Sequence, residues 1–276
     1  MSYTYLVNYH RTIHMKEAES PKTVYYTDEL NDEFSSAKIK TKKISDDYKY
    51  IHTSVFKKIT HFFWYRIVMT PIAFLYLKLK FHHQIINRQL LKGKKKESYF
   101  LIGNHTQATA DAYIPSFLAF PKNCYCIVHA NNVSMPVLGK ITPSLGALPL
   151  PATLKATRNF LSAIKTRVNE NKAIVIYPEA HIWPYCTFIR PFKSNAFHYP
   201  VSLNKPVYCF TNTYQKRKNG KVKIVTYIDG PFYPDNNLDN VDAKEKLRDE
   251  VYETMCKEAL HNTVEVIHYE RKKDNG

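Results

Sequence analysis

The sequence predicts an α/β fold with a mixed, largely parallel sheet that helices cover on both faces. From residue 98 onward, short continuous apolar runs alternate with longer amphipathic runs. This alternation is typical of strands that are buried on both faces and joined by helices. The chain has 276 residues and an apolar share of 44%, which is enough for a sizeable core in one large domain.

The expected strands are the most apolar short runs, and the expected helices lie between them. The strands are SYFLIG at 98–103, CYCIVHA at 124–130, ALPLP at 147–151, AIVIYPE at 173–179, PVYCFTNTY at 206–214 and KVKIVTYID at 221–229. The helices span 104–120, 153–172 and 242–262. The last helix has Asp242 and Glu245 at the spacing of an N-terminal capping box.

Two segments precede this α/β domain of residues 98–276. Residues 1–54 are polar and lack a sustained strand or helix period, so we expect a weakly ordered lead-in. Residues 55–97 are rich in aromatic and aliphatic side chains among cations. Their most apolar stretch, 62–77, is shorter than the ~20 residues of a spanning helix, and Pro71 interrupts it.

We therefore expect an amphipathic helical pair at 55–97, hinged at Pro71, that associates with a membrane. It would lie in the cytoplasmic face of the cell membrane as a monotopic or peripheral anchor. The alternative is a helical hairpin packed on the domain, with its cations in solvent.

The composition narrows the range of partners. Lys and Arg number 40 against 24 Asp and Glu, a net charge of +16, which indicates an acidic partner such as anionic lipid, nucleic acid or an acidic carrier protein. The seven glycines do not form a dinucleotide or P-loop motif. Five cysteines without a C-x-x-C pair favour a reducing compartment. Cys124, Cys126 and His129 lack a fourth ligand, so no metal is expected.

The strongest chemical signal is at the end of the first predicted strand of the domain. Asn104-His105 follows that strand, and Asp111 comes six residues after the histidine. A neutral imidazole can take a proton from a hydroxyl, and a carboxylate on its other nitrogen fixes the tautomer. Glu179 follows another apolar strand, and ligands of α/β sheets gather at such strand ends. A histidine that only pins a loop is the alternative for His105.

These motifs, in their order and spacing, resemble the 1-acyl-sn-glycerol-3-phosphate acyltransferase family, the lysophosphatidate acyltransferases. The similar region covers about residues 98–214, with Asn104-His105…Asp111, Pro136-Val137-Leu138-Gly139, Tyr177-Pro178-Glu179 and Lys205-Pro206-Val207-Tyr208. The family carries N-H-x4-D and then F-P-E-G-T-R after a membrane-associated helical pair. The resemblance also places the apolar segment at 55–90 where the family has its anchor.

The resemblance implies transfer of a fatty acyl group from acyl-CoA or an acyl carrier protein thioester to the free hydroxyl of a lysophospholipid, such as 1-acyl-glycerol-3-phosphate. It implies His105 as general base and Asp111 as its partner. It also implies acceptor binding by Glu179 and Asn104, with no cofactor and no metal. Backbone N–H groups near the start of the helix after His105 would stabilise the oxyanion.

The sequence departs from the family pattern in two ways. Five residues separate His105 from Asp111, where the family has four. The family's phosphate-holding arginines are missing near 147–151 and after Glu179. The candidate substitutes are His181, Arg190 and Lys193, with Lys140 as a further cation.

Two alternatives to a lysophospholipid acyltransferase remain open at this stage. The first is acyl transfer to a non-phosphate alcohol. The second is a non-catalytic basic protein that binds anionic membrane or nucleic acid. Nucleic acid is the less favoured partner, because no known basic-aromatic motif is present and the cations are dispersed.

Overall fold

The computed structural model describes residues 21–34 and 40–272. Within these residues, seven strands form a central sheet in the order β2-β8-β7-β3-β6-β4-β5. The strands are β2 (Gln84–Ile86), β3 (Tyr99–Gly103), β4 (Cys124–Val128), β5 (Ala147–Pro149), β6 (Ala173–Ile176), β7 (Val207–Lys216) and β8 (Val222–Phe232). β7 and β8 are antiparallel, and the other neighbours run parallel. The mixed, largely parallel sheet is confirmed.

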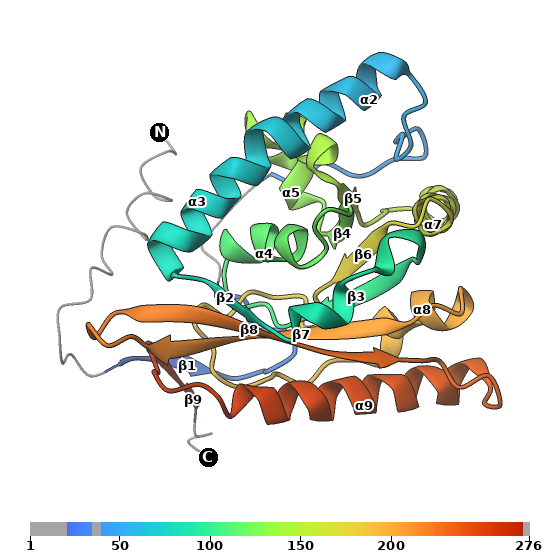
Figure 1. Cartoon of the computed structure of the whole chain (residues 1–276). Coiled ribbons are helices and arrows are strands. Elements are labelled where there is room, and N and C mark those ends of the chain that lie inside the picture. The colour runs from blue at the N-terminus through green and yellow to red at the C-terminus, as the bar shows by residue number, and fades with distance from the viewer. Residues whose placement is uncertain (1–20, 35–39, 273–276) are drawn as a thin grey trace.

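Helices cover both faces of this sheet (Figure 1). α7 (Leu154–Asn169) and α9 (Asn240–Ala259) pack on the face that contains Phe100 and Ile102. α3 (Thr70–Phe81) and α4 (Ala110–Leu118) pack on the face that contains Tyr99 and Leu101. Because successive side chains of β3 point to opposite faces and both faces are covered, the whole strand is apolar. This explains why its sequence shows no polar alternation.

Short helical segments complete the connections. They are η2 (Arg88–Leu91), η3 (Lys94–Lys96), α5 (Asn131–Ser134), α6 (Leu138–Ile141), η4 (Thr142–Leu145), η5 (Ser194–Phe197) and α8 (His198–Ser202). The expected capping box of α9 is wrong by one turn. Asp239 is the N-cap, and its carboxylate accepts hydrogen bonds from the amides of Val241 and Asp242. Asp242 instead lies in the first turn.

The expected pair of helices hinged at Pro71 is one continuous helix. α2 (Val55–Phe62) passes through a π-helical segment, η1 (Phe63–Met69), directly into α3, so that the helix spans Val55–Phe81, 27 residues. A proline clashes with the carbonyl four residues before it in a regular α-helix. The wider π turn immediately before Pro71 removes this conflict. The Thr70 amide and hydroxyl both donate to the Tyr65 carbonyl, the hydroxyl at 2.7 Å.

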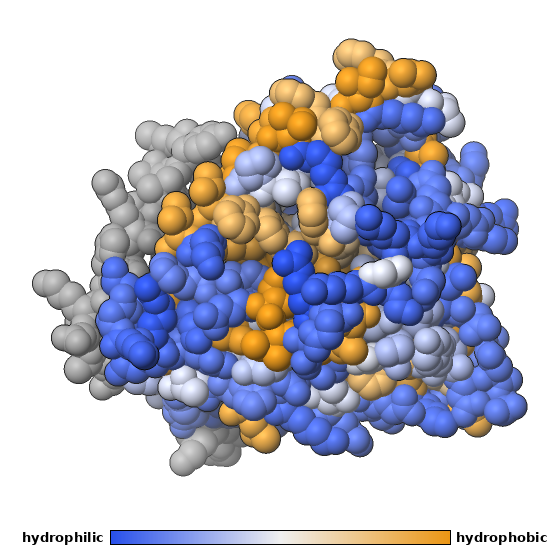
Figure 2. All heavy atoms as spheres, in the orientation of Figure 1, coloured by the Kyte–Doolittle hydropathy of each residue, from blue (hydrophilic) through white to orange (hydrophobic). Residues whose placement is uncertain are grey.

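This helix exposes most of its apolar side chains. By length and composition it is sufficient to cross a membrane, and only 17% of its most apolar window is buried in the protein. Figure 2 shows hydrophobic residues gathered over α2 and α3. The exposed large apolar residues are Val55, Phe56, Ile59, Phe62, Phe63, Ile67, Ile72, Phe74, Leu75 and Leu79. Its buried side chains, Tyr65, Ala73, Leu77 and Phe81, pack against the domain.

The expectation of an irregular lead-in is wrong for residues 22–26, which form a strand. β1 (Lys22–Tyr26) pairs in parallel with β9 (Ile267–Arg271) in a second small sheet. Tyr26 packs on buried Trp183, with ring centroids 4.9 Å apart. Residues 40–54 form no helix or strand, but Ile44 and Tyr50 are buried in the core of the main domain. Residues 1–20 and 35–39 of the lead-in lie outside the described part of the chain. β2, which was expected in the helical pair, is a strand of the main sheet.

Candidate active site

The two motifs that the sequence singled out lie at one edge of the sheet. β3 and β6 are parallel neighbours, so their carboxyl ends meet at that edge. The loops that follow them are joined by backbone hydrogen bonds. The Trp183 amide donates to the His105 carbonyl at 3.2 Å, and the Tyr185 amide donates to the Thr106 carbonyl at 3.0 Å. The structure therefore brings together residues that are separated by about seventy positions in the chain.

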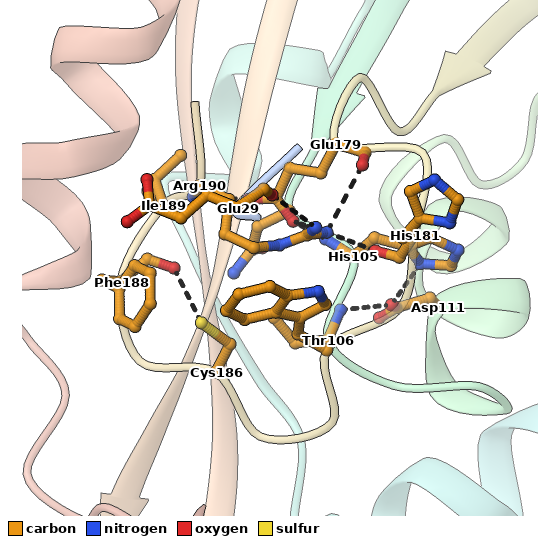
Figure 3. A network of polar contacts seen from close by, with 12 residues as sticks. Glu29, His105, Thr106, Asp111, Glu179, His181, Cys186, Phe188, Ile189 and Arg190 are labelled. Carbon is orange, nitrogen blue, oxygen red and sulfur yellow. Dashed lines mark hydrogen bonds and ion pairs between the residues drawn. The ribbon is translucent and has the colours of Figure 1, made fainter. Parts of the chain in front are cut away.

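His105 and Asp111 form a hydrogen-bonded pair (Figure 3). His105 Nδ1 lies 2.9 Å from Asp111 Oδ2, and the same oxygen accepts the amides of Thr106 and Gln107, each at 2.8 Å. The five residues between His105 and Asp111 include a turn at 108–109, just before α4 begins at Ala110. The His105 side chain is 19% exposed and that of Asp111 is 2% exposed. An incoming molecule can therefore reach the imidazole, while the carboxylate stays sealed behind it.

An aromatic side chain, Tyr177, lies against both members of the pair. The Tyr177 ring stacks on His105 with centroids 4.5 Å apart, and its hydroxyl donates to the Asp111 carbonyl at 2.5 Å. Burial raises the pKa of Asp111, while the hydrogen bonds from His105 and the two loop amides oppose this shift. Burial also raises the pKa of Tyr177, so this side chain is a neutral platform for the imidazole at ordinary pH.

Glu179 and Arg190 are sealed inside the protein, so the expectation that they contact the acceptor is wrong for this structure. Their side chains are each 1% exposed and form an ion pair at 3.2 Å. Glu179 also accepts the amides of His105 at 2.9 Å and Arg190 at 3.1 Å. Burial raises the pKa of Glu179, and the guanidinium and these amides oppose it. The carboxylate thus holds the backbone of His105.

Arg190 makes further internal contacts that explain its burial. Its guanidinium donates to the carbonyls of His181 and Glu29 and lies 4.8 Å from the centre of the Trp183 ring. Glu29 belongs to the segment after β1, so the N-terminal part of the described chain closes over this arginine. Arg190 cannot replace a phosphate-binding arginine in this arrangement.

The other predicted acceptor residues have different placements. Asn104 is buried and exchanges two hydrogen bonds with the backbone of Asn212, at 2.8 and 3.0 Å. It therefore joins β3 to β7 instead of facing an acceptor. Lys193 is exposed and precedes η5, which packs with α9 on the sheet face opposite α4. It does not lie with the His105 loop.

His181 keeps an exposed position in the loop after β6. Its side chain is 35% exposed, and its Nδ1 lies 3.0 Å from a carboxylate oxygen of Glu33. His181 lies two residues before Trp183, whose amide donates to the His105 carbonyl, so it remains a candidate to replace one of the family's arginines.

Sequence reasoning missed the polar residues of β7 and β8 near the pair. Asn212 donates its side-chain amide to Asp111 Oδ1 at 3.3 Å. A signal was present: Thr211-Asn212-Thr213 is a run of three polar residues inside an otherwise apolar strand, and all three are buried. Buried polar groups in a strand require partners. In the described residues, no cluster of three or more His, Cys, Asp or Glu is arranged to hold a metal ion.

The fold and the site define an α/β protein with an accessible imidazole–carboxylate pair at the end of a central parallel strand. Residues 80–230 match the family model described as Acyltransferase, and the chain belongs to this family. No curated protein matches the chain. Among solved structures it is similar to the crystal structure of PlsC, the 1-acyl-sn-glycerophosphate (LPA) acyltransferase from Thermotoga maritima. The TM-score is 0.50 and the identity 16%, over 75% of this chain and 81% of that chain.

The comparisons confirm the resemblance seen in the motifs at the level of family and fold. At this identity the likeness to PlsC supports the arrangement of strands and helices, and the chemistry has to be argued from the residues of this chain.

Proposed function

We propose that the protein is a glycerolipid acyltransferase. It transfers a fatty acyl group from a thioester donor, acyl-CoA or acyl carrier protein, to the free hydroxyl of a lysophospholipid such as 1-acyl-glycerol-3-phosphate. The observation that carries this proposal is the accessible His105 ring, with Nδ1 2.9 Å from the sealed Asp111 carboxylate, in a chain of the acyltransferase family.

In the proposed mechanism His105 acts as the base. Its Nδ1–H donates to Asp111, which leaves Nε2 free of its proton and able to accept the proton of the acceptor hydroxyl. The hydroxyl oxygen bonds to the thioester carbonyl carbon, and the C–S bond then breaks. The thiol leaving group has a pKa of ~8.5, so the thiolate leaves readily and takes up the proton from the imidazole or from water.

The oxyanion needs N–H donors near this point. The amides of Thr106 and Gln107 are committed to Asp111, which contradicts their use for the oxyanion. The amides of Ala108 and Thr109, in the next turn before α4, are our candidates. No cofactor takes part in the proposed reaction.

We propose that the helix Val55–Phe81 associates with the cytoplasmic face of the cell membrane without crossing it. Four of its side chains are buried against the domain, so one side of the helix is bound to protein while the exposed apolar side can enter one leaflet. The net charge of +16 would attract the protein to anionic lipid.

The central test is transfer of a labelled acyl group by the purified protein. Acyl-CoA and acyl carrier protein thioesters are offered with a panel of lysolipids. His105→Ala is expected to lower turnover by about 10²- to 10⁴-fold, the usual contribution of a general base, with an unchanged circular dichroism spectrum. Unchanged turnover in this variant would refute the role of the base.

Membrane association has a separate test in vesicles of phosphatidylcholine and phosphatidylglycerol. Leu75→Asp removes an apolar side chain that is 54% exposed on α3, and we expect binding to weaken by tenfold or more, since burying a leucine contributes about 1.5–3 kcal/mol. Leu154→Asp is the control, because Leu154 is 89% exposed on α7. Equal binding of the two variants would contradict the assignment of the apolar helix.

A second acceptor class is supported by the burial of Arg190. Its guanidinium is occupied by Glu179 and backbone carbonyls, and the family's two phosphate-binding arginines are both missing from the sequence. A non-phosphate alcohol is therefore the alternative acceptor. The same lysolipid panel separates the two classes, because acceptors with and without a phosphate monoester are compared directly.

A further inference from the structure

A polar pair in the middle of the sheet is not used by the mechanism proposed above. Asn212 of β7 and Thr226 of β8 are directly opposite in the antiparallel pair, and they are 1% and 0% exposed. Burying an amide and a hydroxyl costs free energy unless both are hydrogen-bonded. The hydrogen-bond partners of Asn212 and Thr226 therefore indicate the role of the two side chains.

Their contacts form a chain that ends at the candidate catalytic pair. Asn212 Nδ2 donates to Asp111 Oδ1 at 3.3 Å. Thr226 Oγ1 donates to Asn212 Oδ1 at 2.6 Å. His83 Nε2 lies 2.8 Å from Thr226 Oγ1. His83 is the second residue after the end of α3, so these hydrogen-bonded side chains join the end of the apolar helix to Asp111.

The direction of each hydrogen bond follows from the chemistry of the groups. Asp111 carries two acceptor oxygens, so the Asn212 amide must present its N–H there and its oxygen to Thr226. The Thr226 hydroxyl has one proton, which goes to that oxygen. It must therefore accept from His83, which sets the Nε2–H tautomer of this ring. Burial lowers the pKa of His83 to about 4, so the ring is neutral at pH 7.

We infer that His83, Thr226 and Asn212 are positioning residues that hold the Asp111 carboxylate ionised and aimed at His105. The inference rests on the proposed role of His105 as the base. Every donor in the chain points toward Asp111, and hydrogen bonds aligned in this way polarise one another. With Asp111 Oδ2 occupied by His105 and two loop amides, Asn212 supplies the donor to the other oxygen.

The other titratable groups near His83, Thr226 and Asn212 do not compete with these residues for the Asp111 carboxylate. Burial raises the pKa of the groups that face Asp111 from the neighbouring strands, so they are neutral at ordinary pH; these are Tyr177, Tyr214 and Cys126. Lys78 and Arg88 oppose a charge on His83. Glu179, paired with Arg190, faces the His105 backbone.

The test compares Thr226→Val, which removes the hydroxyl at nearly constant shape, with Thr226→Ser, which keeps it. In acyl transfer by the full chain, Thr226→Val is expected to lower kcat by about three- to tenfold, the effect of one hydrogen bond. It should also move the acid limb of the pH–rate profile upward by roughly half a unit to one unit. Without the Thr226 hydroxyl on its oxygen, the Asn212 amide is a weaker donor to Asp111. The Asp111 carboxylate is then more basic, so the pair takes up its proton at a higher pH. The KM for the thioester should stay unchanged.

Thr226→Ser is expected to restore the wild-type profile, and His83→Phe to reproduce the shift of Thr226→Val. A merely structural role for the chain would lower the melting temperature of Thr226→Val and leave the acid limb in place, which would overturn the inference. Loss of activity in His105→Ala together with an unmoved limb in Thr226→Val would reject the chain and keep the proposed function. Full activity in His105→Ala would reject both.

Histidine side-chain ¹⁵N spectra provide a readout that does not depend on turnover. The wild-type protein should show His83 as the neutral Nε2–H tautomer at pH 7. A proton on Nδ1 alone would break the chain at its first bond and overturn the inference.

Discussion

The variant Glu179→Gln distinguishes two possible roles of the Glu179 carboxylate, which are support of the fold and binding of the acceptor. In the structure Glu179 accepts three N–H groups, from the His105 amide, the Arg190 amide and the Arg190 guanidinium, at 2.9–3.2 Å. Glutamine has one acceptor oxygen, and its NH₂ group would face another donor. The buried guanidinium would also lose its counter-charge. Removing one partner of a buried ion pair costs about 3–5 kcal/mol, and at ~2–4 °C for each kcal/mol the melting temperature should fall by roughly 6 to 20 °C.

The matched control is Glu170→Gln in an exposed pair. Glu170 is 41% exposed and lies 2.7 Å from Arg167, so the same chemical change should cost less than about 1 kcal/mol. Thermal unfolding followed by circular dichroism measures both variants. Glu179→Leu with Arg190→Met should be more stable than Glu179→Leu alone, because no buried charge remains unpaired. A stable Glu179→Gln enzyme with a raised KM for the acceptor would refute the scaffolding assignment and restore the substrate-binding one.

Two further predictions concern ionisation. Asp111→Asn should lower turnover less than His105→Ala does. It should also move the acid limb of the pH–rate profile to lower pH, because a neutral amide no longer stabilises the imidazolium of His105. An acid limb at the wild-type pH would contradict coupling of the pair. His83 has a pKa of about 4 in the fold against ~6.5 when unfolded. The unfolded chain therefore binds the extra proton first, and stability falls as the pH drops from about 6.5 toward 4. Urea unfolding of His83→Gln should show a shallower loss over this range, and equal slopes would contradict the burial of a neutral imidazole.

The elements that the sequence predicted correctly are those whose signal is local. Strands such as Ala173–Ile176 are apolar because they are buried on both faces, and this is visible in a window of a few residues. β1 and β9 were missed for the opposite reason. Each is a short strand with polar and charged residues, and its partner strand is at the other end of the chain, so no local window contains the evidence for pairing.

The long apolar helix shows a different limit. Pro71 is a valid signal for an interrupted α-helix, and the structure does interrupt it, with a π turn in place of a hinge. The choice between these outcomes depends on packing, since Tyr65 and Leu77, on either side of the proline, are both buried against the domain. A bend would remove one of them from its contacts. Proline spacing alone does not contain this information.

The same difference between local and distant signals applies to the residues of the candidate site. His105 and Asp111 were paired correctly because both lie at one strand-to-helix junction, where six residues of chain limit their separation. Glu179 was assigned to the acceptor from its place at a strand end and from the family resemblance, and Arg190 as a candidate substitute for the family's missing arginines. Their burial depends on distant cover, from Trp183 and from the carbonyl of Glu29, and nothing near Glu179 in the sequence indicates that cover.

The contrast between Asp111 and Glu179 explains how one sheet edge holds two buried carboxylates with different roles. Both accept hydrogen bonds from the loop after β3, and burial raises the pKa of both. The partner that each carboxylate orients is what differs. Asp111 orients an imidazole that is 19% exposed, so its charge can stabilise a proton that arrives from outside. Glu179 orients a guanidinium that is 1% exposed and always charged, so its charge stabilises the fold. The exposure of the partner, more than the carboxylate itself, is therefore the reason that we propose catalysis for Asp111 and support of the fold for Glu179.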